Sequence, residues 1–143
     1  MSITREDLLG VANKKEQLSM FEYWSEPEKD PRIVSVQDMV SEYKTTAKQS
    51  SDPSRSLDLM EEEWFELHEA DNELDCIKEL ADVVYVIYGF AVDMGWNLDE
   101  AVRRVHENNM GRMFQDDGTI KRREDGKIMK NPNYPAVNLE DLV

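Results

Sequence analysis

Two pairs of carboxylates at helical spacing constrain this chain more than any other feature of its sequence. The first pair is Glu63 and Glu66, and the second pair is Glu79 and Asp82. Residues three positions apart share one face of an α-helix, so each pair can direct both carboxylates toward one point. Two such helices packed side by side would bring four acidic side chains together.

The residues around these carboxylates indicate that the pairs face other parts of the protein. The first pair interrupts a stripe that includes Leu59 and Ala70, and the second pair begins a segment, residues 80–91, that is apolar on nearly all sides. Such a segment is typical of a buried central helix. Carboxylates clustered there lose hydration and repel one another, which costs several kcal/mol per ion unless a positive charge is supplied.

A divalent metal ion is the natural source of that positive charge, because Lys78 is the one lysine or arginine within these two segments. A ligand set made only of oxygens favours Mg²⁺, or Mn²⁺ as an alternative, over Zn²⁺. Surface charge is the simpler interpretation of Glu62, Glu63 and Glu66 taken alone. The second pair, in its apolar segment, favours the metal site.

The length and charge of the chain limit its organisation and its partners. A chain of 143 residues with 40% hydrophobic content forms one domain, in which we expect an N-terminal helix and linker over residues 1–34 and the main domain over residues 35–143. The net charge of −14 argues against a nucleic-acid partner, which would require a basic face. It is compatible with a metal-dependent enzyme acting on a small anionic substrate.

Cysteine content and hydropathy predict a cytoplasmic protein, in the host cytoplasm if it is viral. The single cysteine, Cys76, excludes an internal disulfide and fits a reducing compartment. The N-terminus shows no long apolar stretch typical of a secretory signal. The apolar run of residues 83–92 is too short to span a bilayer, so we expect no membrane partner.

The hydrophobic periodicity predicts an all-α fold, a helical bundle followed by a short irregular or hairpin C-terminal flap. The flap is indicated by Asp117-Gly118 and Asp125-Gly126, which are typical turn sequences. Ser50 to Ser56 reads as a polar loop. The expected helices span residues 4–24, a segment capped by Ser35, residues 57–71, residues 73–94 ending at Gly95, and a segment capped by Asn97 with Glu100.

The acidic motif resembles that of a known enzyme family. Glu62-Glu63-x-x-Glu66, a spacer of twelve residues and Glu79-x-x-Asp82 resemble the signature of the MazG-like all-α nucleoside triphosphate pyrophosphohydrolases, which are similar to phosphoribosyl-ATP pyrophosphohydrolase. The resemblance covers about residues 36–142 and is nearest to the single-domain proteins that many bacteriophages carry. It extends to three further blocks, residues 80–89, residues 106–113 and residues 125–135.

The resemblance implies hydrolysis of a nucleoside triphosphate between the α and β phosphates, giving a monophosphate and pyrophosphate. By position, Glu63, Glu66, Glu79 and Asp82 would hold Mg²⁺, and Glu62 would be a further ligand or the base that orients water. Among the (deoxy)nucleoside triphosphates, dGTP is the first substrate that we would test.

Further residues are candidates for binding the substrate. Asn109 and Arg112 occupy the family's Asn-x-x-Lys-like position, with arginine in place of the usual lysine, which changes the geometry of its contacts. Basic residues beyond the predicted bundle could bind phosphate. Two aromatic residues could stack on a base, whereas we expect Trp64 to belong to the core. These remaining candidates are Arg55, Lys121, Arg122, Lys127, Lys130, Trp96 and Tyr134.

Two other functions are compatible with an acidic helical protein. A ferritin-like di-metal carboxylate bundle depends on Glu-x-x-His motifs, and neither His68 nor His106 lies in one. A non-catalytic protein that imitates nucleic-acid charge would place its carboxylates outside and need no metal. Because short bundles with a helix that is apolar on every side usually complete their core with a second copy, we also expect a homodimer or homotetramer.

Overall fold

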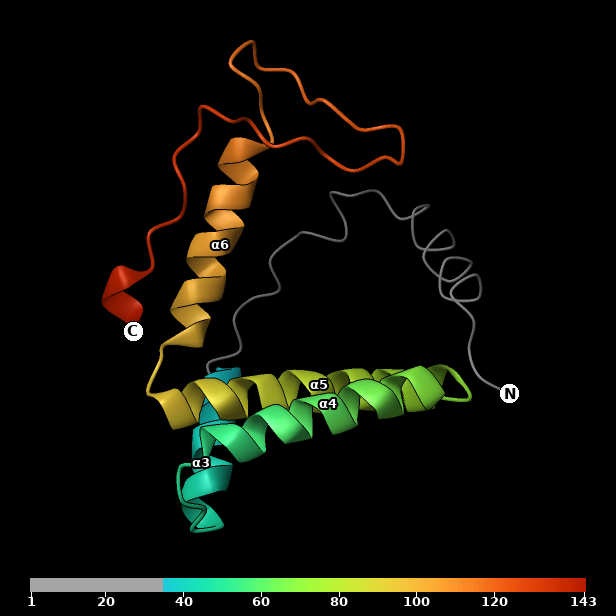
Figure 1. Cartoon of the computed structure of the whole chain (residues 1–143), viewed down its shortest axis with the longest axis vertical. Helices are drawn as coiled ribbons and strands as arrows, with labels where there is room; N and C mark the ends of the chain where they lie inside the picture. Colours follow the sequence, from blue (N-terminus) through green and yellow to red (C-terminus); the bar gives the residue numbers. More distant parts are fainter. Residues whose placement is uncertain (1–34) are drawn as a thin grey trace, which may run out of the picture. The chain divides into compact units, whose positions relative to one another are not determined.

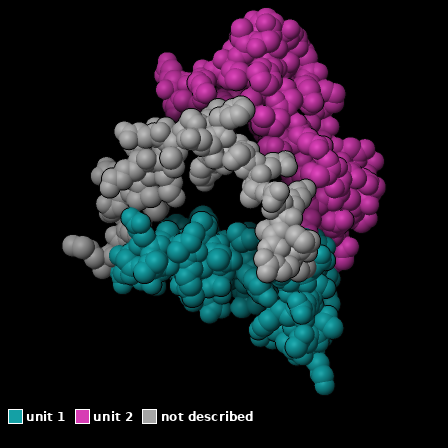
Figure 2. Space-filling view, turned by 180° about the vertical axis from the view of Figure 1, so that it is seen from behind, with its two compact units in different colours: residues 1–94 teal, residues 95–143 magenta. Residues whose placement is uncertain are grey.

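The computed structural model describes residues 35–143 and divides the chain into two compact units, residues 1–94 and residues 95–143 (Figure 2). The helix and linker predicted within residues 1–34 lie outside the described residues. The domain boundary expected after residue 34 therefore stays a prediction. None of the helices in the described part of the chain is long and apolar enough to cross a membrane.

Unit 1 is built from three helices, α3 (Val36–Thr46), α4 (Pro53–Glu69) and α5 (Glu73–Met94). Helices α4 and α5 form an antiparallel hairpin and lie side by side, and α3 packs across α5 (Figure 1). The predicted cap of α3 is confirmed, because the Ser35 Oγ atom accepts a hydrogen bond of 3.1 Å from the Asp38 backbone N–H. The expected bounds of α5 are also confirmed.

Helix α4 begins earlier than the sequence suggested. Residues 53–56 are its first turn, so the prediction of a polar loop over residues 50–56 is wrong for its second half. The Asp52 side chain accepts a hydrogen bond of 3.1 Å from the Arg55 backbone N–H. Pro53 at the first helical position lacks only an N–H that would have no partner there. Polar composition was therefore a poorer guide here than the Asp-Pro helix start.

The core of unit 1 is small and leaves one face of α5 exposed. The buried apolar residues include Val40, Val83 and Ala91, whereas Leu80 is 46% exposed. The prediction that α5 is buried on all sides is therefore wrong for the single chain. The core position expected for Trp64 is also wrong, because this residue is 53% exposed. Within unit 1, α5 packs against α3 and α4, and two neighbours cannot cover a helix that is apolar all round.

A buried ion pair links the three helices of unit 1. The Asp93 side chain, 3% exposed, receives a hydrogen bond of 2.9 Å from Lys44 Nζ and one of 2.6 Å from Ser56 Oγ. Burial alone would raise the pKa of Asp93, but these two hydrogen bonds and the Lys44 charge outweigh it and hold the pKa below its ordinary value. Asp93 is thus held in its charged form where α3, α4 and α5 meet.

Unit 2 contains helix α6 (Leu98–Arg112) and a short 3-10 helix, η1 (Glu140–Leu142). The Asn97 side chain caps α6 by accepting a hydrogen bond of 3.1 Å from the Glu100 backbone N–H. Between these helices, isolated antiparallel bridges join Phe114 to Ile120 and Arg122 to Ile128. The all-α fold with a small irregular flap is therefore confirmed for the described residues.

We expect Asp93→Asn to lower the free energy of unfolding by roughly 2 to 3 kcal/mol at pH 7, because Lys44 loses its buried counter-charge. The folded-state pKa of Asp93 is lowered, so this stability is present above its ordinary pKa of 3.8 and is lost as the pH falls through the folded-state value. Urea unfolding of both proteins from pH 7 to pH 2.5 should show the difference shrinking below pH 3.8.

The matched control for this variant is Asp141→Asn, which removes a carboxylate that pairs with Arg104 but is 62% exposed. We expect a clearly smaller effect from this exposed pair. An Asp93→Asn variant as stable as the wild type at pH 7 would contradict the stabilising role of the buried pair.

Candidate active site

Three carboxylates meet where α4 and α5 lie side by side. Glu63 on α4 and both Glu79 and Asp82 on α5 each place one carboxylate oxygen within 4.8 Å of the others, and all three residues are partly buried. The antiparallel hairpin explains this, because it sets the carboxylate of one helix against the pair on the other. Glu62 and Glu66 are exposed residues of α4 and are not among these three.

The electrostatics of this acidic cluster, Glu63, Glu79 and Asp82, are unfavourable. Burial raises the pKa of Glu63 above its ordinary value, and three neighbouring carboxylates raise it further. In decreasing order of effect these neighbours are Glu66, Asp82 and Glu79, while the charge of Lys78 acts in the opposite direction. Glu66 therefore contributes to the potential of the acidic cluster even though it lies toward solvent.

Lys78 is the cation that contacts the acidic cluster. Its Nζ atom lies 3.0 Å from Glu79 Oε1, 3.1 Å from Glu79 Oε2 and 3.0 Å from Asp82 Oδ2. The Lys78 side chain is 62% exposed, whereas that of Glu79 is 13% exposed. A solvent-exposed ammonium group therefore contacts two carboxylates that are both less exposed than it is.

The acidic cluster fits a small divalent cation. Its donors are all carboxylate oxygens, which Mg²⁺ and Mn²⁺ prefer. Two ligands on opposite sides of Mg²⁺ lie about 4 Å apart, and the oxygens of the acidic cluster lie within 4.8 Å of one another. Small side-chain rotations would bring Glu63, Glu79 and Asp82 around one ion. The single positive charge of Lys78 cannot balance three carboxylates.

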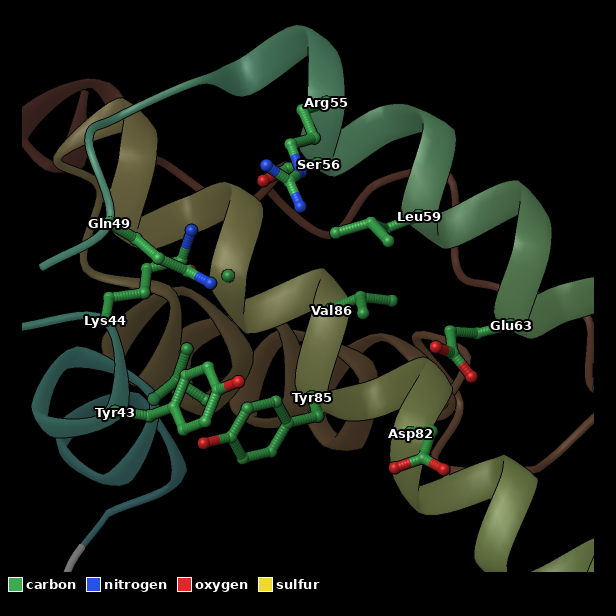
Figure 3. A pocket seen from close by; sticks show the side chains of 12 residues that line it. Tyr43, Lys44, Gln49, Arg55, Ser56, Leu59, Glu63, Asp82, Tyr85 and Val86 are labelled. Atoms are coloured by element: carbon green, nitrogen blue, oxygen red, sulfur yellow. The ribbon is translucent and has the colours of Figure 1, made fainter. Parts of the chain in front are cut away.

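A pocket of about 430 Å³ opens beside the acidic cluster (Figure 3). Glu63 and Asp82 lie at one end, and Lys44, Gln49 and Arg55 lie at the other. The pocket therefore has a negative end for cations and an opposite end that offers hydrogen-bond donors. Its sides are formed by Tyr43, Tyr85, Leu59 and Val86.

Most lining residues of this pocket were not predicted from the sequence, although helical spacing could have indicated several of them. Ser56 and Leu59 precede Glu63 by seven and four positions, and Val86 follows Asp82 by four positions, so each shares a helix face with a carboxylate. Gln49 had no such signal, because it belongs to the segment between two helices. Arg55 was predicted, and it lies in the first turn of α4.

The other predicted substrate-binding residues belong to unit 2, so their part in the site stays a prediction. Arg112 is partly buried and its Nε atom is without a hydrogen-bond partner among the described residues. Tyr134 packs against Gly111, where an added Cβ atom would lie 2.1 Å from the Tyr134 Oη atom. Trp96 is partly buried. The exposed residues of this group are Asn109, Lys121, Arg122, Lys127 and Lys130.

A solved structure with a similar fold is the MazG-like pyrophosphohydrolase of cyanophage S-2L, bound to dGDP and three catalytic Mn²⁺ ions per active site. It is 22% identical in sequence, the match covers 69% of this chain and 91% of the other, and the TM-score is 0.47. No curated protein matches the chain in sequence. The family model for phosphoribosyl-ATP pyrophosphohydrolase matches residues 35–109, which are more than half of the chain.

That match spans the three helices of unit 1 and most of α6, and it includes every residue of the acidic cluster. The likeness to the cyanophage protein is too distant to add support to the family match. The agreement of the family model with an all-α fold and with converging carboxylates shows what kind of enzyme this is. The chain belongs to the phosphoribosyl-ATP pyrophosphohydrolase family and is a nucleotide pyrophosphohydrolase.

Proposed function

We propose that this enzyme hydrolyses (deoxy)nucleoside triphosphates between the α and β phosphates, with Mg²⁺ as its metal, to give a monophosphate and pyrophosphate. The observation that carries the proposal is the acidic cluster of Glu63, Glu79 and Asp82 at one end of a pocket of about 430 Å³. A pocket of this volume lies within the range typical of small-molecule sites.

In this proposal, Glu63, Glu79 and Asp82 hold the divalent cation, and Glu66 adds a fourth carboxylate one helical turn from Glu63. The bound cation would neutralise negative charge on the phosphate oxygens as the α–β bond breaks. The chain's own contribution is to hold these carboxylates close together. The raised pKa of Glu63 shows that its charged form is disfavoured without a cation, so a bound metal ion would stabilise it.

Glu62 is our candidate for orienting the attacking water. Its exposed carboxylate neighbours Glu63 on α4 and can accept a proton from a water molecule. The oxygen of that water then bonds to the α phosphorus, and the bridging oxygen leaves with the pyrophosphate. The alternative role of Glu62 is that of one more metal ligand.

The far end of the pocket supports dGTP as the first substrate to test. Lys44, Gln49 and Arg55 offer hydrogen-bond donors there. Guanine presents two acceptors, O6 and N7, on one edge, whereas adenine presents an amino donor in place of O6. Tyr43 and Tyr85 lie beside this space and contact each other edge to face, with ring centroids 5.8 Å apart, so one of the two rings could stack on a base.

We also propose that the protein is a homodimer or a homotetramer. One stripe of α5 carries exposed apolar side chains at positions spaced by three and four residues, which places them on one face. They range from 39% exposed at Ile87 to 62% exposed at Ile77. A contiguous apolar face of this kind is typical of protein interfaces. The stripe consists of Ile77, Leu80, Val84 and Ile87.

We expect Glu79→Gln to lower kcat/KM by about 100-fold or more, because the acidic cluster loses the charge of its least exposed carboxylate on α5. The assay is pyrophosphate release from a panel of natural and modified nucleoside triphosphates. Glu73→Gln is the matched control, since it removes an exposed carboxylate from the first turn of the same helix. The function of a nucleic-acid mimic would change with neither substitution. Equal activity in the wild type and both variants would contradict the proposed site.

Removing divalent metal with EDTA should abolish the activity, and adding Mg²⁺ should restore it, with Mn²⁺ as a substitute. Chromatography of the products should show dGMP and pyrophosphate in equal amounts when dGTP is supplied. Release of dGDP and inorganic phosphate would show cleavage at the other bond and would refute the proposed reaction.

Ile77→Asp should shift the protein from an oligomer to a monomer in light scattering, because a carboxylate would be buried without a partner in the interface. The side chain is 62% exposed in the single chain, so the monomer itself should remain folded by circular dichroism. A wild-type protein that is already monomeric would remove the proposal of an oligomer.

A further inference from the structure

Lys78 contacts the atoms that the proposed metal would need. Its Nζ atom reaches both oxygens of Glu79, at 3.0 and 3.1 Å, and one oxygen of Asp82 at 3.0 Å. An ammonium group has three donors, and three such contacts occupy all of them. Both Glu79 and Asp82 belong to the acidic cluster. The ammonium group therefore contacts two of the three carboxylates of the acidic cluster.

We propose that Lys78 acts as the cation of the acidic cluster when no metal is bound, and that it must leave for a divalent metal to bind, so that Lys78 sets the metal affinity of the site. This inference rests on the proposed function, because it takes the acidic cluster as the metal site. Lys78 is in these terms a positioning residue, since it acts on the carboxylates of Glu79 and Asp82.

The first step of the argument is competition for the same oxygens. Glu79 has two carboxylate oxygens, and Lys78 lies within hydrogen-bonding distance of both. A metal that takes one of them displaces a hydrogen bond, and the two positive charges then repel each other at short range. Metal binding and the Lys78 contacts are therefore mutually exclusive or strongly opposed.

The second step is that Lys78 is more exposed than both of its partners. The Lys78 side chain is 62% exposed, whereas those of Glu79 and Asp82 are 13% and 41% exposed. A lysine has a long flexible stem and its ammonium group is strongly hydrated, so it can return to water at little cost. The more buried Glu79 carboxylate is then left without its cation and is available to the metal.

The third step is the need for a cation in the metal-free protein. The carboxylate oxygens of Glu63, Glu79 and Asp82 lie within 4.8 Å of one another, so their negative charges repel unless a cation lies close to them. The ion pairs to the acidic cluster in the part of the chain that the structure describes come from Lys78 alone. Lys78 thus stabilises the folded site in the absence of metal. It also reduces the free energy that is gained when the metal binds, because its own contacts are then lost.

A role of Lys78 in holding substrate phosphate would predict a different result. In that case the loss of its charge would raise KM for the nucleotide and leave the affinity for metal alone unchanged. Measurements with the metal alone therefore separate the two roles. The variant Lys78→Gln removes the charge and keeps a chain of nearly the same length, and Lys78→Arg keeps the charge.

The experiment titrates the full-length protein with Mn²⁺ in the absence of nucleotide and follows free Mn²⁺ by electron paramagnetic resonance. We expect Lys78→Gln to bind Mn²⁺ about three- to tenfold more tightly than the wild type, and Lys78→Arg to restore the wild-type affinity within about twofold. The difference should shrink in high salt, which screens exposed charges. Urea unfolding in EDTA should give a lower midpoint for Lys78→Gln than for the wild type.

The matched control is Arg103→Gln, which removes one positive charge from an ion-paired helix surface on α6. It should bind Mn²⁺ like the wild type. Equal or weaker binding by Lys78→Gln would overturn the role of Lys78 and leave the metal site standing. A wild type that binds no Mn²⁺ would overturn the metal site and the role of Lys78 together.

Discussion

The carboxylates of Glu63, Glu79 and Asp82 lie within 4.8 Å of one another, although like charges at such distances repel. The antiparallel packing of α4 on α5 holds them there. Desolvation and repulsion raise the pKa of Glu63, and Lys78 offsets part of this effect. The scaffold therefore stores unfavourable electrostatic energy at the acidic cluster, as is common for sites that bind cations.

A second charged group, Asp93, binds two residues that line the same pocket away from the acidic cluster. Asp93 is 3% exposed and links Lys44 of α3 to Ser56 of α4. In contrast to the acidic cluster, this group is balanced, because Asp93 has a cation and a hydroxyl donor as partners. The charge of Asp93 is thus balanced near one end of the pocket, whereas the carboxylates at the other end are not balanced. A ligand that carries cations at its phosphate end complements such an arrangement.

Helical periodicity was sufficient for part of this structure. It located α5 at Glu73–Met94 and the caps at Ser35 and Asn97, because caps and apolar spacing are local properties. It failed where packing decides the outcome. Trp64 was expected in the core and is 53% exposed, since an apolar residue on a helix is buried only if another element covers it. The start of α4 differs from the expectation for a local reason, because the Asp52-Pro53 cap begins a helix inside a polar segment.

The sequence by itself determined which residues share a helix face, and hence that Glu79 and Asp82 lie on the same face of α5. Its acidic motif also gave the resemblance to the all-α pyrophosphohydrolases. Only the tertiary structure decided that Glu63 meets them and that Glu66 lies toward solvent. It also brought Lys44 and Gln49 into the pocket with Asp82. The physical reason is that spacing along one helix sets an angle, whereas distances between helices depend on how their side chains pack.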